Sequence, residues 1–185
     1  LRDGTLLSDL LAQAAEVAER DGRVDAAIKY LSTALELAGR VDNQRSRNQA
    51  VGHLGSLGRI LFRASQFEKA QATFRQQQDA ARKIKNRMEE GRALVNEAAV
   101  LQSREQYDSA LERLRIGLDV SRSVGDLLTV SKAQHNTAHI YARRGDNGLA
   151  KKGFEESLQT ARSIRWREGV AMNHAWLKKV GSTSS

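Results

Sequence analysis

The residues with the clearest potential for chemistry are His135 and His139, which stand four positions apart in the segment HNTAH. On a helix this spacing places both imidazoles on one face, which is the arrangement of a metal-binding pair. The segment lacks the acidic residue of a zinc-protease motif, and no third ligand is spaced to join the pair. We therefore expect neither a metal nor a cofactor, and we interpret the histidines as polar residues on a solvated or ligand-facing surface.

A second candidate is the glycine series Gly52, Gly55 and Gly58 in VGHLGSLG. Glycines cradle phosphate where a strand leads into a helix, whereas these lie inside an apolar-periodic helical segment with no preceding strand. Gly58 falls at a packing position, but Gly52 and Gly55 each cost a helix about 1 kcal/mol relative to alanine. Two interpretations stay open for them: they admit another chain closely, or they are tolerated defects.

The sequence offers no spacing of a nucleophile, a base and an orienting group that indicates catalysis, so we expect a protein that is not an enzyme. Cysteine is absent, which excludes thiolate chemistry and fits a cytoplasmic (intracellular) protein. No stretch approaches the roughly 18 apolar residues of a membrane span, so no membrane partner is expected.

These residues are positioned by a repeat of roughly 40 residues. Four segments end in an alanine that opens a helix, and each alanine is followed four residues later by a large apolar residue on the same helical face. Twelve residues before each alanine stands a small residue that lets two helices approach. The alanines, large residues and small residues are, in order, Ala27, Ala70, Ala110 and Ala150; Leu31, Phe74, Leu114 and Phe154; Ala15, Gly58, Ala98 and Ala138.

Each unit is therefore predicted to contain two helices, and the absence of proline favours this. First helices are expected near 5–20, 44–64, 87–104 and 127–144, and second helices near 24–40, 67–85, 107–124 and 147–164. Gly22 and Gly145 mark turns, and Ser65 and Glu105 replace glycine in the middle units. A single domain over 1–180 would comprise units 5–43, 44–86, 87–126 and 127–165 and a capping helix 166–180, followed by a disordered tail 181–185.

The pattern resembles the tetratricopeptide repeat, whose helix–turn–helix unit has small residues at its eighth and twentieth positions. The spacing near 40 rather than 34, with GRA from Gly91 and VGD from Val124, is similar to the long repeats of Leu-Gly-Asn-type G-protein signalling modulators. The chain lacks the family's first-helix tryptophan and its closing proline. The resemblance implies an all-α, right-handed α-solenoid of four repeats plus a C-terminal capping helix.

The resemblance also implies a concave groove lined by the first helices. In the second to fourth units its positions carry no acidic residue, whereas the first unit places Asp9, Glu16 and Glu19 there. In similar proteins, asparagines at the positions of Asn96 and Asn136 hydrogen-bond the ligand backbone, and neighbouring basic residues hold the carboxylates of the ligand. The implied peptide-binding residues are Arg59, Phe62, Arg63, Arg92, Asn96, Lys132, His135, Asn136, His139 and Arg143.

We therefore expect a scaffold or adaptor that binds an acidic peptide segment of a partner protein. The alternative is a packing module of a larger ciliary or signalling assembly, which would use its edges or convex face and could self-associate through the terminal helix. Nucleic-acid binding through the net charge of +8 ranks third, because the few aromatic residues fall on packing positions and leave no stacking platforms.

Overall fold

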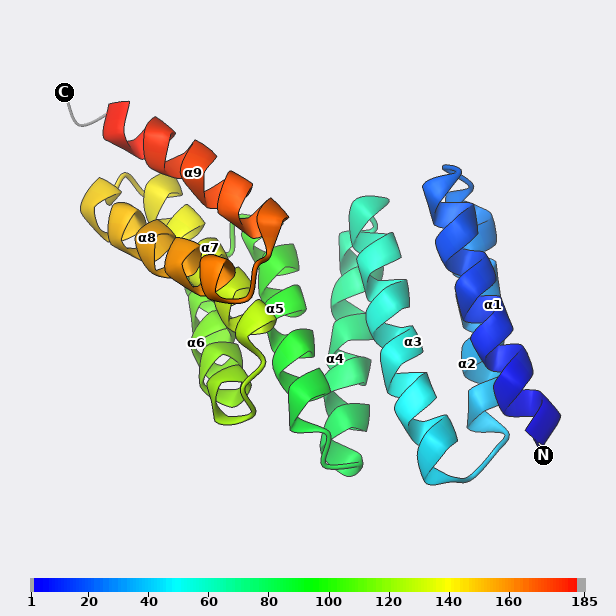
Figure 1. Cartoon of the computed structure of the whole chain (residues 1–185). Coiled ribbons are helices and arrows are strands. Elements are labelled where there is room, and N and C mark those ends of the chain that lie inside the picture. The colour runs from blue at the N-terminus through cyan, green and yellow to red at the C-terminus, as the bar shows by residue number, and fades with distance from the viewer. Residues whose placement is uncertain (1, 183–185) are drawn as a thin grey trace.

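The computed structural model describes residues 2–182, and this part of the chain forms nine α-helices without a strand (Figure 1). All nine expected helices are confirmed. They are α1 (Arg2–Arg20), α2 (Val24–Gly39), α3 (Gln44–Arg63), α4 (Phe67–Lys83), α5 (Arg87–Ser103), α6 (Tyr107–Ser123), α7 (Leu127–Arg143), α8 (Asn147–Ser163) and α9 (Arg167–Ser182).

The helices stack as four hairpins and a ninth helix, which is the all-α solenoid expected from the repeat. Each odd-numbered helix from α3 to α9 packs against the second helix of the preceding hairpin and also touches its first helix. Because every unit contacts only its neighbours, the stack extends in one direction, and α1 and α9 lie at its opposite ends (Figure 1).

The core repeats along the stack at the predicted small and large positions. Leu31 packs with Ala15, Leu114 with Ala98, and Phe154 with Ala138, and all six side chains are buried. In the second unit Phe74 occupies the space beside Gly58, where a Cβ atom would collide with the ring. The packing explanation for Gly58 is therefore confirmed.

The turns within the four hairpins share one backbone conformation whether or not they contain glycine. Gly22 and Gly145 adopt φ of 74° and 83°, and Ser65 and Glu105 at the equivalent positions both adopt 58°. In each case the next residue donates its backbone N–H to a carbonyl near the helix end, for example Gln66 N to Leu61 O at 2.9 Å. This is the left-handed helix end that favours glycine, so Ser65 and Glu105 adopt it at a cost in free energy.

Ion pairs connect successive units and explain an alternation of charge along the chain. The charged residues of segment 44–86 are mainly basic, whereas segments 1–43 and 87–126 have more acidic than basic residues. Arg63 pairs with Glu19 of the first unit, and Arg75 and Arg82 pair with the buried Glu97 and Glu90 of the third. Opposite charges thus meet across the unit boundaries and favour a single stacking register.

The last helix corrects one expectation. Because α9 continues to Ser182, the disordered tail predicted from residue 181 is wrong for Gly181 and Ser182, and residues 183–185 lie outside the described residues. Val180 is buried against α7 and α8, and Ser182 Oγ donates to Lys179 O at 2.8 Å, which stabilises the final turn. None of the described helices combines the length and the apolar character needed to cross a membrane.

Candidate functional site: a groove across three first helices

A groove of about 390 Å³ runs across α3, α5 and α7. It brings together four of the predicted site residues, Arg59, Arg92, Asn96 and Lys132, from three successive units. The full lining is Gly52, Ser56, Arg59, Gln77, Glu89, Arg92, Val95, Asn96, Leu128, Thr129 and Lys132. We call this feature the basic groove.

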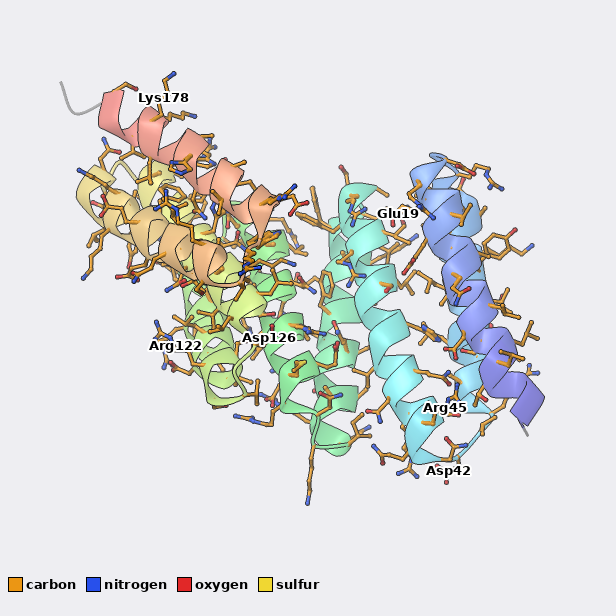
Figure 2. All side chains as sticks on the ribbon, viewed as in Figure 1. Glu19, Asp42, Arg45, Arg122, Asp126 and Lys178 are labelled. Atoms are coloured by element: carbon orange, nitrogen blue, oxygen red, sulfur yellow. The ribbon has the colours of Figure 1, made fainter. Side chains whose placement is uncertain are left out.

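Arg92 is held by acidic partners of its own. Its Nη1 donates to Glu89 Oε1 at 2.7 Å, and its Nε donates to Asp126 Oδ2 at 2.9 Å. Asp126 also caps α7 by accepting from Thr129 N and Thr129 Oγ1. Figure 2 shows Asp126 at the start of α7, beside α5. Arg92 therefore ties α5 to α7, and its charge is largely neutralised within the protein.

The titration of this pair reflects the same contacts. Burial alone would raise the pKa of Asp126, but hydrogen bonds from Thr129 and Arg92 outweigh burial and lower the pKa. For Arg92, burial opposes the charged form, and the hydrogen bond to Asp126 reverses the effect and raises the pKa. Both groups stay charged near neutral pH.

Arg59 and Lys132 differ from Arg92, because neither forms an ion pair with another described residue. Arg59 donates only to Ser56 Oγ, at 3.0 Å. Burial in the wall of the groove lowers the pKa of Lys132, and the positive charge of Arg59 lowers it further. Burial likewise lowers the pKa of Arg59, with a further contribution from Arg63. The groove thus holds two exposed cations, one on α3 and one on α7, that repel each other. Carboxylates act against this repulsion, Asp126 at Lys132 and Glu19 and Glu89 at Arg59, but the pKa values of both cations stay lowered.

The glycines on α3 give the groove its floor. Gly55 leaves room for Gln77 of α4, whose Nε2 would lie 2.6 Å from a Cβ atom at position 55. Gln77 reaches between α3 and α5 and donates to Glu89 Oε2 at 2.9 Å. A Cβ at Gly52 would meet no atom within 4 Å, so this glycine borders open space in the groove. Of the two interpretations, close approach fits Gly55, where the approaching group is a side chain of the same protein.

Phe62 and Arg63 lie outside the basic groove, near the end of α3. The Phe62 ring packs against Phe67 across the turn, with ring centroids 5.8 Å apart. Arg63 pairs with Glu19 of α1, which Figure 2 shows between α1 and α3. Part of the negative charge of the first unit therefore neutralises a cation of the second unit.

The prediction that His135 faces a ligand is wrong. Its side chain is 7% exposed, its Nδ1 donates to Asn173 Oδ1 of α9 at 2.9 Å, and its ring contacts Phe154. Burial lowers the pKa of His135 and keeps the imidazole neutral. Because α9 covers this part of α7, a position predicted for the groove becomes part of the core.

The remaining predicted residues also fall outside the basic groove. His139 packs its ring against Trp176 and accepts from Gln102 Nε2 at 2.6 Å. With Arg143 it lines a separate hollow of about 180 Å³, where Arg143 lies 3.5 Å from Glu105. Asn136 lines neither hollow. Among the side chains that the structure describes, no group of three His, Asp or Glu residues is arranged to hold a metal ion.

A larger hollow of about 650 Å³ lies between α4 and α6. Its cations are already paired: Arg75 and Arg113 with the buried Glu97, and Arg144 with Asp108. This hollow therefore offers little unsatisfied charge to a ligand, and the smaller basic groove is the better candidate.

Sequence reasoning missed Ser56, Gln77, Glu89 and Leu128 as lining residues. The prediction considered fixed positions on first helices, whereas Gln77 comes from a second helix and Glu89 lies before those positions. One signal in the sequence points to Gln77, namely the costly Gly55 inside a helix. A second signal, the helix-start pattern Asp126-x-x-Thr129, marks Asp126 as the carboxylate beside Arg92.

Comparison with known proteins supports this architecture. Aspartyl phosphate phosphatase F from Bacillus subtilis matches with a TM-score of 0.80 at 14% identity, over 90% of this chain and 43% of that one. A Rap protein complexed with competence and sporulation factor matches with 0.77 at 16% identity, over 91% and 47%. A putative kinesin light chain from Podosopora anserina gives 0.68 at 12% identity, over 98% and 97%.

These structural likenesses show the fold, and the chain spans less than half the length of the first two proteins. No curated protein matches the sequence. The finer resemblance to Leu-Gly-Asn-type modulators stays a prediction. Residues 11–156, which are most of the chain, match the family model for the tetratricopeptide repeat protein 21 ARM repeat, and the chain therefore belongs to that family.

Proposed function

We propose that the chain is a non-enzymatic adaptor or scaffold module that binds an acidic segment of a partner protein in the basic groove. The observation that carries this proposal is the pair Arg59 and Lys132. Two cations that repel each other, with no ion-pair partner among the described residues, are stabilised when an anion binds between them.

The rest of the groove supports a protein segment as the ligand. Asn96 lies on α5 between the two cations and offers an amide to a ligand backbone. Leu128, which is 37% exposed, adds apolar surface, whereas Val95 in the groove wall is only 3% exposed. The favoured ligand is therefore an extended segment with an acidic side chain beside an aliphatic one. Because binding orders the segment, we expect a Kd of about 1 μM or weaker.

The structural neighbours add a supporting analogy. One of them, a Rap protein, was solved in complex with competence and sporulation factor, so a solenoid of this type can hold a bound factor. Another is named as an aspartyl phosphate phosphatase, but the two histidines that drew attention in this sequence are engaged in packing contacts. The proposal therefore assigns binding and not hydrolysis to this chain.

The test measures, by fluorescence anisotropy, how a fluorescein-labelled peptide of alternating Glu and Leu binds to two chains. One is the unchanged chain, and the other is the groove variant, which combines Arg59→Gln and Lys132→Gln. Loss of two charge-assisted contacts should weaken binding at least about tenfold. The matched control is Lys83→Gln, Lys151→Gln, which removes the same charge from exposed positions on α4 and α8. Circular dichroism establishes that all three chains are folded.

Equal affinity of the unchanged chain and the groove variant would refute the groove as the binding surface. A parallel titration with a single-stranded oligonucleotide of equal charge separates the nucleic-acid alternative. Tighter binding to the oligonucleotide, with a steep salt dependence and an equal loss in both double variants, would favour general electrostatic binding instead.

The alternative function, a packing module of a larger assembly, is favoured by a different observation. Large apolar side chains are exposed on α1, at the opposite end of the stack from α9. On α9 only Met172 is a large exposed hydrophobic residue within the described part, so self-association through that helix has less apolar surface to use.

A further inference from the structure

The outer face of α1 carries a stripe of exposed apolar residues. Leu6, Leu10 and Val17 are 58%, 51% and 45% exposed, and Leu7 beside them is 48% exposed. Their spacings of four and seven residues place Leu6, Leu10 and Val17 along one side of the helix. In a globular protein, a neighbouring element normally covers the apolar stripe of an amphipathic helix.

The repeat register identifies what covers this stripe in the other units. The residues equivalent to Val17 are Ile60, Val100 and Ile140, which are 4%, 0% and 0% exposed. Ile60 packs with Leu31 of α2, Val100 with Phe74 of α4, and Ile140 with Leu114 of α6. In every case the cover is the second helix of the preceding hairpin.

Leu10 also stands at a position that is buried in the other units. Its equivalents are His53, Ala93 and Ala133, all buried, and His53 lies 2.8 Å from Ser8 on the first helix of the preceding hairpin. Leu7 is equivalent to Ala50, Glu90 and Val130, of which Ala50 is partly buried and the other two are 3% and 4% exposed. The exposed residues of α1 thus occupy the positions that form the stacking interface elsewhere.

We propose that this face of α1 receives the second helix of a further hairpin of the same repeat type, carried by the same polypeptide and stacked as the unit before α1. The incoming helix presents small and large apolar residues as α2 does towards α3. The inference is independent of the basic groove, because the groove lies on α3, α5 and α7.

A second copy of the chain fits this face less well. Pairing two α1 helices would bury one stripe of about 16 Å on each copy, from Leu6 to Val17. A stable interface buries about 800 Å² per partner, which three or four partly exposed side chains do not supply. Stacking of a hairpin continues an interface that the protein already forms three times between successive hairpins.

The experiment duplicates residues 1–43 in front of Leu1. This fusion reproduces the natural register, because residues 1–43 then precede α1 as they precede α3. The added hairpin meets Leu10 and Val17 where the original first hairpin meets His53 and Ile60. Leu10→Ser with Val17→Ser is made either in the inner copy, next to Gln44, or in the added outer copy, which serves as the matched control.

In the inner copy the two substitutions should lower the unfolding midpoint by at least about 6 °C, because they place hydroxyls in a buried interface. In the outer copy, where both residues stay exposed, the change should remain within about 2 °C. Equal effects in both copies would overturn the proposal. So would a concentration-dependent dimer of the unchanged chain that these substitutions abolish, since the occupant would then be a second copy.

Discussion

The basic groove and the seam between α7 and α9 lie on corresponding faces of successive first helices, yet one is open and the other is closed. In the groove, Gly52 leaves open space beside α3, and the side chains of Arg59 and Lys132 border solvent. In the seam, His135 is buried against Asn173, and the Trp176 ring stacks on Phe154 with centroids 5.5 Å apart.

The difference follows from side-chain size and hydrogen bonding. At the groove, Gly52 has no side chain to fill the space and the cations border solvent, whereas the seam has aromatic rings that fill the gap and an asparagine that satisfies the buried polar atoms. Asn173 accepts from His135 and donates to Ser157 Oγ and Gly169 O at 2.9 and 2.8 Å. The groove is therefore suited to binding, and the seam stabilises the end of the stack.

The largest expected effect is on the seam. Phe154→Ala should lower the free energy of unfolding by about 3–5 kcal/mol, because it empties a fully buried site between Ala138, His135 and Trp176. Urea denaturation measures this. Leu128→Ala in the groove is the matched control and should cost below about 1 kcal/mol, since Leu128 is partly exposed. Similar costs for both would contradict the division into a packed seam and an open groove.

Substitution of one asparagine in each region tests the same difference between the seam and the groove. Asn173→Ala leaves His135 without its hydrogen-bond partner, removes one of the hydrogen bonds of Ser157, and should cost about 1–3 kcal/mol. Asn96→Ala in the groove removes no hydrogen bond to another described residue, so stability should change by less than about 0.5 kcal/mol while peptide affinity falls. Urea midpoints and anisotropy on both variants provide the readouts. Weakened peptide binding in Asn173→Ala but not in Asn96→Ala would reverse the assignment.

The seam should also be sensitive to mild acid. Burial lowers the pKa of His135, and burial followed by the proximity of His135, Arg143 and Lys179 lowers the pKa of His139. An unfolded chain takes up these protons near pH 6.5, and the folded chain does not. Stability should therefore fall as the pH drops through about 6.5 and level off below the folded-state pKa values.

Hydrogen exchange at pH 7.5 and pH 5.5 tests this prediction. Amides of α9 should lose more protection than amides of α5, because both histidines pack against α9. His135→Gln should reduce the difference between the two pH values. A uniform loss along the stack would show that the seam is not the sensitive region.

The smallest expected effect is at the turns, which both regions share. Ser65→Gly should raise the free energy of unfolding by about 0.5 kcal/mol, because glycine adopts the positive φ of this position without strain. Gly145→Ala at the equivalent turn near the seam should lower it by about 1 kcal/mol. Thermal unfolding of the two variants checks the opposite signs, and a stabilising Gly145→Ala would refute the argument.

The groove was predictable only in part. Arg59, Arg92, Asn96 and Lys132 were found because they occupy recurring positions on first helices, and the structure gathers them. Sequence alone could not show that Arg92 is neutralised by Glu89 and Asp126, since the second acid lies 34 residues away and meets Arg92 only after stacking. Nor could it show that Gln77 crosses from a second helix to the groove floor.

By itself the sequence determined the nine helices and their stacking as a solenoid, because small and large residues recur at fixed helical spacings and each turn ends a helix locally. Tertiary structure decided which charges are free and which positions are covered. His135 and Lys132 lie three residues apart on α7, yet one is buried by α9 and the other lines the groove. Burial and charge pairing depend on neighbours distant in sequence, whereas helix periodicity depends on neighbours along the chain.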